Sequence, residues 1–169
     1  LVELTLLPRG LLLLSLEGNL LPLQFDLPLR PGGGGFCFGV CGAYGIALAC
    51  KKNASNESIK DAKNTLVETR PTAINLVWAI NKLCDKLLMT SEDKRSGLAW
   101  QLASNMAEQD VLTNQKIGDN GLSLLKKLNK STLNILTHCN AGWLATIDYG
   151  TALSPIYRAI EHGMKIHVW

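Results

Sequence analysis

The sequence predicts an α/β fold in which a mainly helical region precedes a single β-α-β unit. Residues 73–87 place apolar side chains at every third or fourth position, which is the period of an amphipathic helix. Near the end, two short apolar runs, "TLNILT" (132–137) and "KIHVW" (165–169), flank a third segment with helical spacing. This order is typical of two parallel strands joined by a helix.

The first 35 residues give little structural information. No helical or strand period is visible across residues 9–35, which end in the glycine run "PGGGGF" (31–36). The leucine-rich stretch 11–29 is interrupted by Glu17, Asp26 and prolines, so it is too broken to span a membrane. It also lacks the basic start and clean apolar core of a signal peptide.

Two helices are predicted next. Residues 38–52, "FGVCGAYGIALACKK", are small and apolar, which favours a buried helix packed closely on a neighbour. Residues 55–69, "SNESIKDAKNTLVET", indicate a surface helix with Ser55 or Asn56 as its N-cap.

Residues 70–89 predict an amphipathic helix with Pro71 in its first turn. Its apolar stripe consists of Ala73, Leu76, Val77, Ile80, Leu83 and Leu87. Residues 93–127 predict one or two further helices, and we expect Gly118 and Gly121 in "IGDNG" to break or bend that region.

The last forty residues predict strand, loop, helix and strand in turn. "TLNILT" leads into the glycine-containing loop 139–150, and "TALSPIYRAIEHG" (151–163) has helical spacing with Gly163 as C-terminal cap. "KIHVW" is the second strand. Because one such unit cannot cover both faces of a parallel sheet, we expect further strands from more of this chain or from another chain.

Composition excludes several classes of function. The 169 residues are 47% hydrophobic, and a net charge of +3 with scattered Lys and Arg argues against nucleic-acid binding. The lysine pairs 51–52 and 126–127 are expected on solvated helix surface. The five cysteines are an odd number without a CxxC pair, which favours reduced thiols in the cytoplasm over disulfides or a zinc site.

Cys139 is the first candidate functional residue. It follows a predicted strand, and ligands of open α/β sheets bind beyond the carboxyl ends of strands. The loop glycines would let backbone amides approach an anion, and a following helix N-terminus would lower the pKa of the thiol. A substrate with a phosphate and a reactive carbon would suit this place. The alternative is a small structural cysteine in the core.

Arg70 is the second candidate. Directly before Pro71, it could bind a phosphate with two N–H groups beside free helix amides, or it could be an ordinary exposed arginine. His138 is a poor partner for Cys139 because neighbours on a strand point to opposite faces. His162 and His167 are expected to be structural or surface residues.

Several linked motifs carry a resemblance to a known family. "ETRPTAINLVWAI", "IGDNG", "THCNAGWLAT", "YGTAL" and "HVW" occur in this order. Together they resemble the methylthioribose-1-phosphate isomerase family of methionine salvage, over residues 36–169 and the first half of the family chain. That family is related to the regulatory subunits of a translation initiation factor's nucleotide-exchange complex. "THCNAG" with "YGTAL" favours the isomerases.

The resemblance implies a fold and an activity. A mainly helical domain with a small sheet (residues 1–130, with 1–35 poorly defined) would precede the start of a Rossmann-like domain (131–169). The implied reaction converts 5-methylthioribose 1-phosphate into 5-methylthioribulose 1-phosphate. The resemblance implies a small sugar phosphate as ligand and no metal or cofactor. It also implies a cytoplasmic homodimer that binds no nucleic acid and no membrane. The alternatives are a ribose-1,5-bisphosphate isomerase and a non-catalytic regulatory subunit.

The resemblance also implies site residues. Cys139 matches the family's active-site cysteine, and Arg70 matches its phosphate-contacting arginine. An Arg-Gly-Ala motif of the family aligns with three glycines, so that Gly34 and Gly35 take the places of its Gly and Ala. Its arginine falls on Gly33, and the nearest arginine is Arg30, so the sequence departs from the family pattern here. The family's catalytic aspartate would lie beyond Trp169, as would the Gln and Asn-Lys that hold its substrate.

Overall fold

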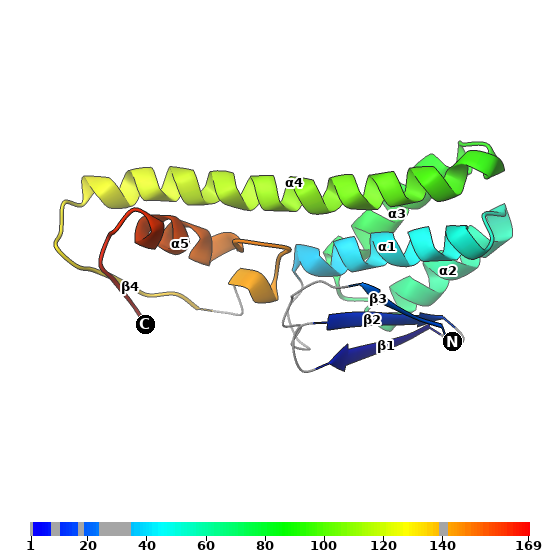
Figure 1. Ribbon diagram of the computed structural model, residues 1–169, viewed down its shortest axis with the longest axis horizontal. Helices are drawn as coiled ribbons and strands as arrows, with labels where there is room; N and C mark the ends of the chain where they lie inside the picture. Colours follow the sequence, from blue (N-terminus) through cyan, green and yellow to red (C-terminus); the bar gives the residue numbers. More distant parts are fainter. Residues whose placement is uncertain (1, 8–10, 17–18, 24–34, 139–141) are drawn as a thin grey trace.

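The computed structural model describes residues 2–7, 11–16, 19–23, 35–138 and 142–169 (Figure 1). Its strands are β1 (Val2–Leu7), β2 (Leu11–Leu16), β3 (Asn19–Leu23), β4 (Leu133–Ile135) and β5 (Ile166–Val168). Its α-helices are α1 (Phe36–Lys52), α2 (Asn56–Thr69), α3 (Ile74–Leu88), α4 (Glu92–Lys127) and α5 (Ser154–Glu161). Two short 3₁₀ turns, η1 (Gly142–Leu144) and η2 (Thr151–Leu153), lie between β4 and α5.

Helix α1 is the centre of the helical body and packs against α2, α3 and α4. Its small residues allow this close approach, because a Cβ atom at Gly42 would lie only 2.5 Å from Cδ1 of Leu76 on α3. The predicted buried helix is therefore confirmed. The core around it contains the fully buried side chains of Val40, Ile46, Ile59, Ile80, Leu83 and Leu87.

The starts of α2 and α3 differ in how well the sequence predicted them. Ser55 is the N-cap of α2, and its Oγ accepts a hydrogen bond from the Ser58 amide at 3.2 Å, as predicted. The apolar stripe of α3 is also confirmed, since five of its six residues are buried and Val77 is partly buried. The placement of Pro71 is wrong, because α3 begins at Ile74 and Pro71 lies in the preceding turn.

The predicted break in α4 is also wrong. One uninterrupted helix of 36 residues passes through Gly118 and Gly121 and runs along most of the molecule (Figure 1). These glycines permit close packing instead. A Cβ atom at Gly118 would lie 2.6 Å from the Ser154 Oγ, and one at Gly121 would overlap the Pro155 ring. Contact with α5 thus explains glycine in the middle of a helix.

The N-terminal residues form a three-stranded antiparallel sheet in the order β1-β2-β3. Strands β2 and β3 fall within residues 9–35, where no period was visible. Consecutive leucines cannot show the alternation of apolar and polar residues by which a strand is recognised. The small sheet that the family resemblance implied is therefore present, although the pattern of residues did not predict it.

The predicted β-α-β unit is confirmed. Strands β4 and β5 pair in parallel with Leu133 opposite Ile166, and α5 connects them. Gly163 follows α5 with a φ of 76° and donates its amide to the Ile160 carbonyl at 2.9 Å, as expected of a C-terminal cap. The α/β fold class thus holds. The domain boundary after residue 130, in the loop between α4 and β4, stays a prediction.

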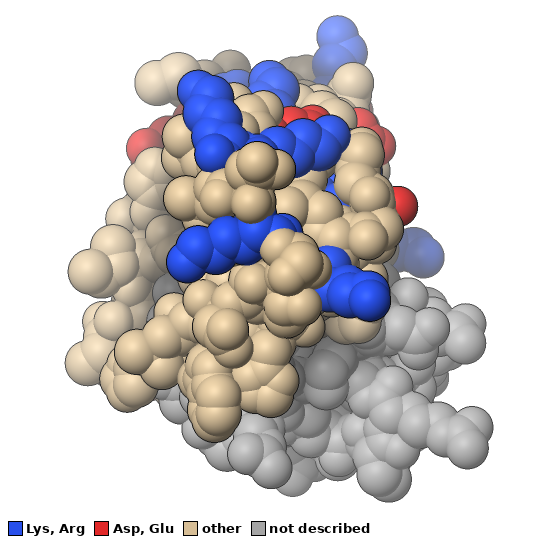
Figure 2. Space-filling view, turned by 90° about the vertical axis from the view of Figure 1, so that its left-hand side faces the viewer, with Lys and Arg blue, Asp and Glu red and all other residues tan. Residues whose placement is uncertain are grey.

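Both predicted lysine pairs lie on exposed helix surface, as expected. Lys126 and Lys127 occupy the last turn of α4, where cations interact favourably with the helix dipole. Lys and Arg side chains gather on this end of the molecule (Figure 2). Within the described ranges, no helix combines the length and apolar character that crossing a bilayer requires.

Candidate functional site

The loop after β4 lies against the N-terminal end of α1, where η1 appears beside the first turn of that helix (Figure 1). The amide of Cys37 donates to the carbonyl oxygen of Ala145 at 3.2 Å. A Cβ atom at Gly35 would overlap that same carbonyl, so only glycine allows this contact. The segment that follows Cys139 in sequence is therefore held over the start of α1.

Arg70 lies at the same end of α1. Its Cζ is 4.4 Å from the ring centroid of Phe38, which belongs to the first turn of that helix. Arg70 is the C-cap of α2, not a residue at the start of α3, because α3 begins four residues later. Arg70 is partly buried, and its guanidinium makes a cation–π contact with Phe38. A guanidinium has several N–H groups that can bind an anion.

The structure brings only some of the predicted site residues together. Gly35 is the N-cap of α1, and both it and Arg70 lie at the N-terminal end of that helix. Cys139 and Gly34 lie outside the described residues, as do Gly33 and Arg30. His162 and His167 are exposed, which agrees with their prediction as structural or surface residues, and His138 is exposed as well.

This end of α1 favours an anion. Helix α1 has 17 residues and no acidic residue in its first turn. Its N-cap residue, Gly35, makes no side-chain capping hydrogen bond. The positive end of the helix dipole therefore faces the region where the Arg70 cation also lies. A phosphate or a carboxylate is the kind of ligand that such a combination can bind.

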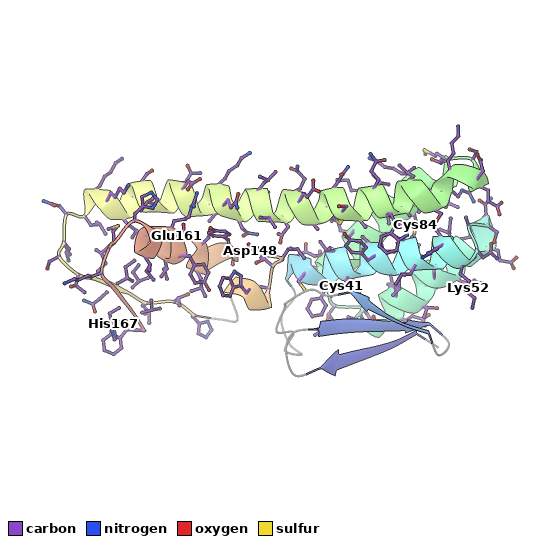
Figure 3. All side chains as sticks on the ribbon, viewed as in Figure 1. Cys41, Lys52, Cys84, Asp148, Glu161 and His167 are labelled. Atoms are coloured by element: carbon purple, nitrogen blue, oxygen red, sulfur yellow. The ribbon has the colours of Figure 1, made fainter. Side chains whose placement is uncertain are left out.

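The loop itself is tightly closed. Gly142, Tyr149 and Gly150 have φ values of 82°, 62° and 43°, in the left-handed region that favours glycine. A Cβ atom at Gly150 would overlap the backbone of Gly142, so the backbones of these two residues lie in direct contact. The Thr146 hydroxyl lies 3.2 Å from the carbonyl oxygens of both Gly142 and Asp148. Asp148 lies where the loop passes between α1 and α5 (Figure 3).

Two buried polar residues of α4, Asp110 and Asn114, also hold this loop. The Asp110 Oδ2 accepts from the Ile147 amide at 2.7 Å, and the Asn114 Oδ1 accepts from the Thr151 amide at 3.1 Å. Burial raises the pKa of Asp110, against the opposing effect of its bonds from Ile147 and Asn114. Sequence reasoning missed both residues. The available signal was two polar residues on the buried stripe of α4.

The loop is tied to α5 by a surface network. The Tyr149 hydroxyl donates to Glu161 at 3.0 Å, and the Arg158 guanidinium lies 5.6 Å from the Tyr149 ring. Arg158 also bonds Asp119 of α4 at 2.8 Å and Glu161 at 2.9 Å. These bonds from Arg158 and Tyr149 lower the pKa of the exposed Glu161 carboxyl.

Cys37 and Cys41 form a second feature of α1. The interaction between their two thiols lowers the pKa of Cys37 and, together with burial, raises that of Cys41. The four described cysteines are all free thiols. In the ranges that the structure describes, no three His, Cys, Asp or Glu residues are placed to hold a metal ion.

A family model and several relatives of this chain point to the same protein family. The initiation factor 2 subunit family (IF-2B) matches residues 39–169. Methylthioribose-1-phosphate isomerase of Escherichia coli O45:K1 (strain S88 / ExPEC) is 47% identical over 136 residues, or 78% of this chain and 37% of that protein. The isomerase of Rhodospirillum rubrum is 45% identical over 140 residues, or 78% of this chain and 36% of that protein. The chain thus spans little more than a third of these relatives.

Two solved structures have a similar fold. The crystal structure of 5-methylthioribose 1-phosphate isomerase from Pyrococcus horikoshii OT3 aligns with a TM-score of 0.73 and 26% identity, over 96% of this chain and 52% of that one. The structure of translation initiation factor eIF-2B, subunit delta, from A. fulgidus aligns with a TM-score of 0.70 and 32% identity, over 95% and 53%. The resemblance predicted from the motifs is therefore confirmed.

Proposed function

This chain belongs to the initiation factor 2 subunit family, and we propose that it is the N-terminal part of a sugar-phosphate isomerase. The proposed reaction converts 5-methylthioribose 1-phosphate into 5-methylthioribulose 1-phosphate. Relatives with 45–47% identity carry this activity in their names. The observation that carries the proposal is the meeting of Gly35, Arg70 and the segment after Cys139 at the N-terminal end of α1.

The phosphate is proposed to bind at that end of α1. Its charge would interact with the helix dipole and with the Arg70 guanidinium, which the Phe38 ring holds in place. Gly34 would let the phosphate come close to backbone amides because it has no side chain, while Gly35 leaves room for the Ala145 carbonyl that holds the loop. Binding the unreactive phosphate fixes the sugar carbons relative to the loop.

The chemistry is an internal rearrangement with no net oxidation. The ring bond between C1 and O4 breaks, the hydrogen on C2 moves to C1, and the proton of the C2 hydroxyl ends on O4 as C2 becomes a carbonyl. The phosphate on O1 prevents ordinary hemiacetal ring opening, so the protein must assist it. We place Cys139 beside C1 and C2, where its thiol would support the hydrogen transfer in a site shielded from water.

A second candidate is a regulatory subunit that binds a sugar phosphate without turnover. The 32% identity with the A. fulgidus eIF-2B delta subunit favours it. Such a protein could keep the phosphate site at α1 and Arg70 and lack the catalytic step. The two candidates therefore predict the same binding and different turnover.

The test uses the purified full-length protein with methylthioribose 1-phosphate and a metal chelator. Ketose formation is measured in one experiment and binding of the sugar phosphate by calorimetry in another. The isomerase proposal predicts both binding and turnover. Binding without ketose formation would contradict it and support the regulatory candidate.

We also propose that the protein is a cytoplasmic homodimer. The free state of Cys37, Cys41, Cys50 and Cys84 supports a reducing compartment. The dimer follows from the family resemblance alone. Light scattering on the full-length protein would measure a mass of twice the chain, and a monomer mass would contradict the dimer.

A further inference from the structure

We infer that Asp110 and Asn114 are positioning residues that fix the loop 142–151 over the N-terminal end of α1. Both lie on the buried face of α4, with 7% and 2% of their surface exposed. Among the described residues, neither is hydrogen-bonded through its side chain to Arg70 or Gly35. Their role would be exerted through the loop backbone, and this inference rests on the proposed function of the site.

Three hydrogen bonds of this pair join parts of the chain that are 37 to 40 residues apart. Asp110 accepts from the Ile147 amide, and Asn114 accepts from the Thr151 amide. The Asn114 Nδ2 donates to Asp110 Oδ1 at 3.0 Å, which fixes the orientation of both side chains. The Ser154 hydroxyl donates to the Asn114 carbonyl oxygen at 2.5 Å. The loop is thus attached to α4 at Ile147 and Thr151, and the start of α5 is attached at Ser154.

A buried carboxylate is costly, so its retention among apolar neighbours calls for a specific partner. The three buried residues of α4 directly before Asp110, which are Ala99, Ala103 and Met106, pack in the hydrophobic core. Asp110 instead directs both oxygens to donors, one from Asn114 and one from the loop. An apolar residue would fill the space but could not satisfy the Ile147 amide.

The attachment is transmitted to the proposed site over a short length of chain. Ile147 lies two residues after Ala145, whose carbonyl accepts from Cys37 at the start of α1. Thr151 follows Gly150, which contacts the backbone of Gly142. Gly142 is the first described residue after Cys139. By holding the loop, Asp110 and Asn114 therefore also set the position of Gly142.

The test measures kcat and KM of the full-length protein together with hydrogen exchange of the loop amides. Asp110→Asn keeps the shape of the side chain but replaces one acceptor by a donor, so it loses one of its two bonds. We expect kcat to fall about 10- to 100-fold, the scale of a displacement near 1 Å, with a smaller change in KM. Exchange of the Ile147 amide should become at least about tenfold faster.

Met106→Ala is the matched control, because Met106 lies one turn away on the same buried face and makes no hydrogen bond to the loop in the described structure. It should lower stability but leave kcat per folded molecule within about twofold of wild type. If Asp110→Asn does not fold, Asn114→Ala carries the test, because it deletes the bond to Thr151 and leaves the Asp110 carboxylate facing Ile147.

The outcomes separate this inference from the proposed function. A wild-type protein without turnover contradicts the proposed function, while loop exchange still tests the attachment. An active wild type with equally active Asp110→Asn molecules overturns the positioning role. Loop amides that exchange at the wild-type rate in Asp110→Asn and Asn114→Ala would show that the pair does not hold the loop.

Discussion

Arg70 and Gly35 show how far single residues can be assigned from sequence. Both are candidates from the sequence alone, and both lie at the N-terminal end of α1. The predicted place of Arg70 at the start of a helix is wrong, since Arg70 caps the end of α2. Phe38, Asp110 and Asn114 were missed because their roles depend on contacts with residues distant in sequence. No local pattern encodes such contacts.

Arg70→Ala should weaken binding of the sugar phosphate by about 1.5–3 kcal/mol, the scale of a lost hydrogen bond to a charged group. Calorimetry on the full-length protein measures this change. Glu68→Ala is the control, because Glu68 is an exposed residue of the same helix end. An unchanged dissociation constant for Arg70→Ala would make Arg70 an ordinary surface arginine.

Cys139→Ser should lower kcat about 100-fold or more, because it removes a group that acts in the transition state. The free energy of unfolding should change little, since the replacement is nearly isosteric. Steady-state kinetics and denaturant unfolding measure the two effects. A core cysteine would give the opposite result, with lost stability and intact activity per folded molecule.

Cys84 gives a prediction about pH. Burial raises the pKa of its thiol to about 11 from a usual value of 9.0. Between these values the unfolded chain ionises first, so the folded state should lose up to about 2.7 kcal/mol as pH rises from about 9 to about 11. Unfolding of wild type and Cys84→Ala across this range measures the effect. Equal slopes for the two proteins would show that Cys84 does not contribute.

Among the elements, α4 shows the limit of reading glycines as helix breakers. Gly118 and Gly121 lie in a segment whose glycines are typical of a turn. The helix nevertheless continues, because α5 packs against both glycines at short distance. Tertiary packing here outweighs local propensity. Helices α2 and α3 were predicted well, because the Ser55 cap of α2 and the apolar stripe of α3 are local features.

Gly118→Ala should destabilise the protein by about 1–3 kcal/mol, because its methyl group would overlap Arg158 and Ser154. Gly97→Ala is the matched control on the same helix, where a Cβ atom meets nothing within 4 Å. That change should stabilise by about 0.5–1 kcal/mol through helix propensity. Thermal unfolding measures both, and stabilisation by Gly118→Ala would contradict the packing described for α5.

For the whole molecule, the sequence predicted the fold class and the parallel β4–β5 pair, because each strand and the helix between them has its own local pattern. The sequence could not predict that the loop after β4 folds back onto α1. That arrangement brings together residues from positions 35, 70 and 145, and it depends on backbone contacts at Gly35 and on Asp110. The candidate site is a property of the assembled fold.

The central claim is that the N-terminal end of α1 holds the phosphate of a sugar whose reacting carbons face Cys139. A crystal structure of the full-length protein with bound 5-methylthioribulose 1-phosphate tests it most directly. The account predicts the phosphate within hydrogen-bond distance of Arg70 and of backbone amides near Gly35, with the Cys139 sulfur facing C1 and C2. A phosphate bound elsewhere, or a Cys139 sulfur packed in apolar core with no cavity beside it, would contradict the account.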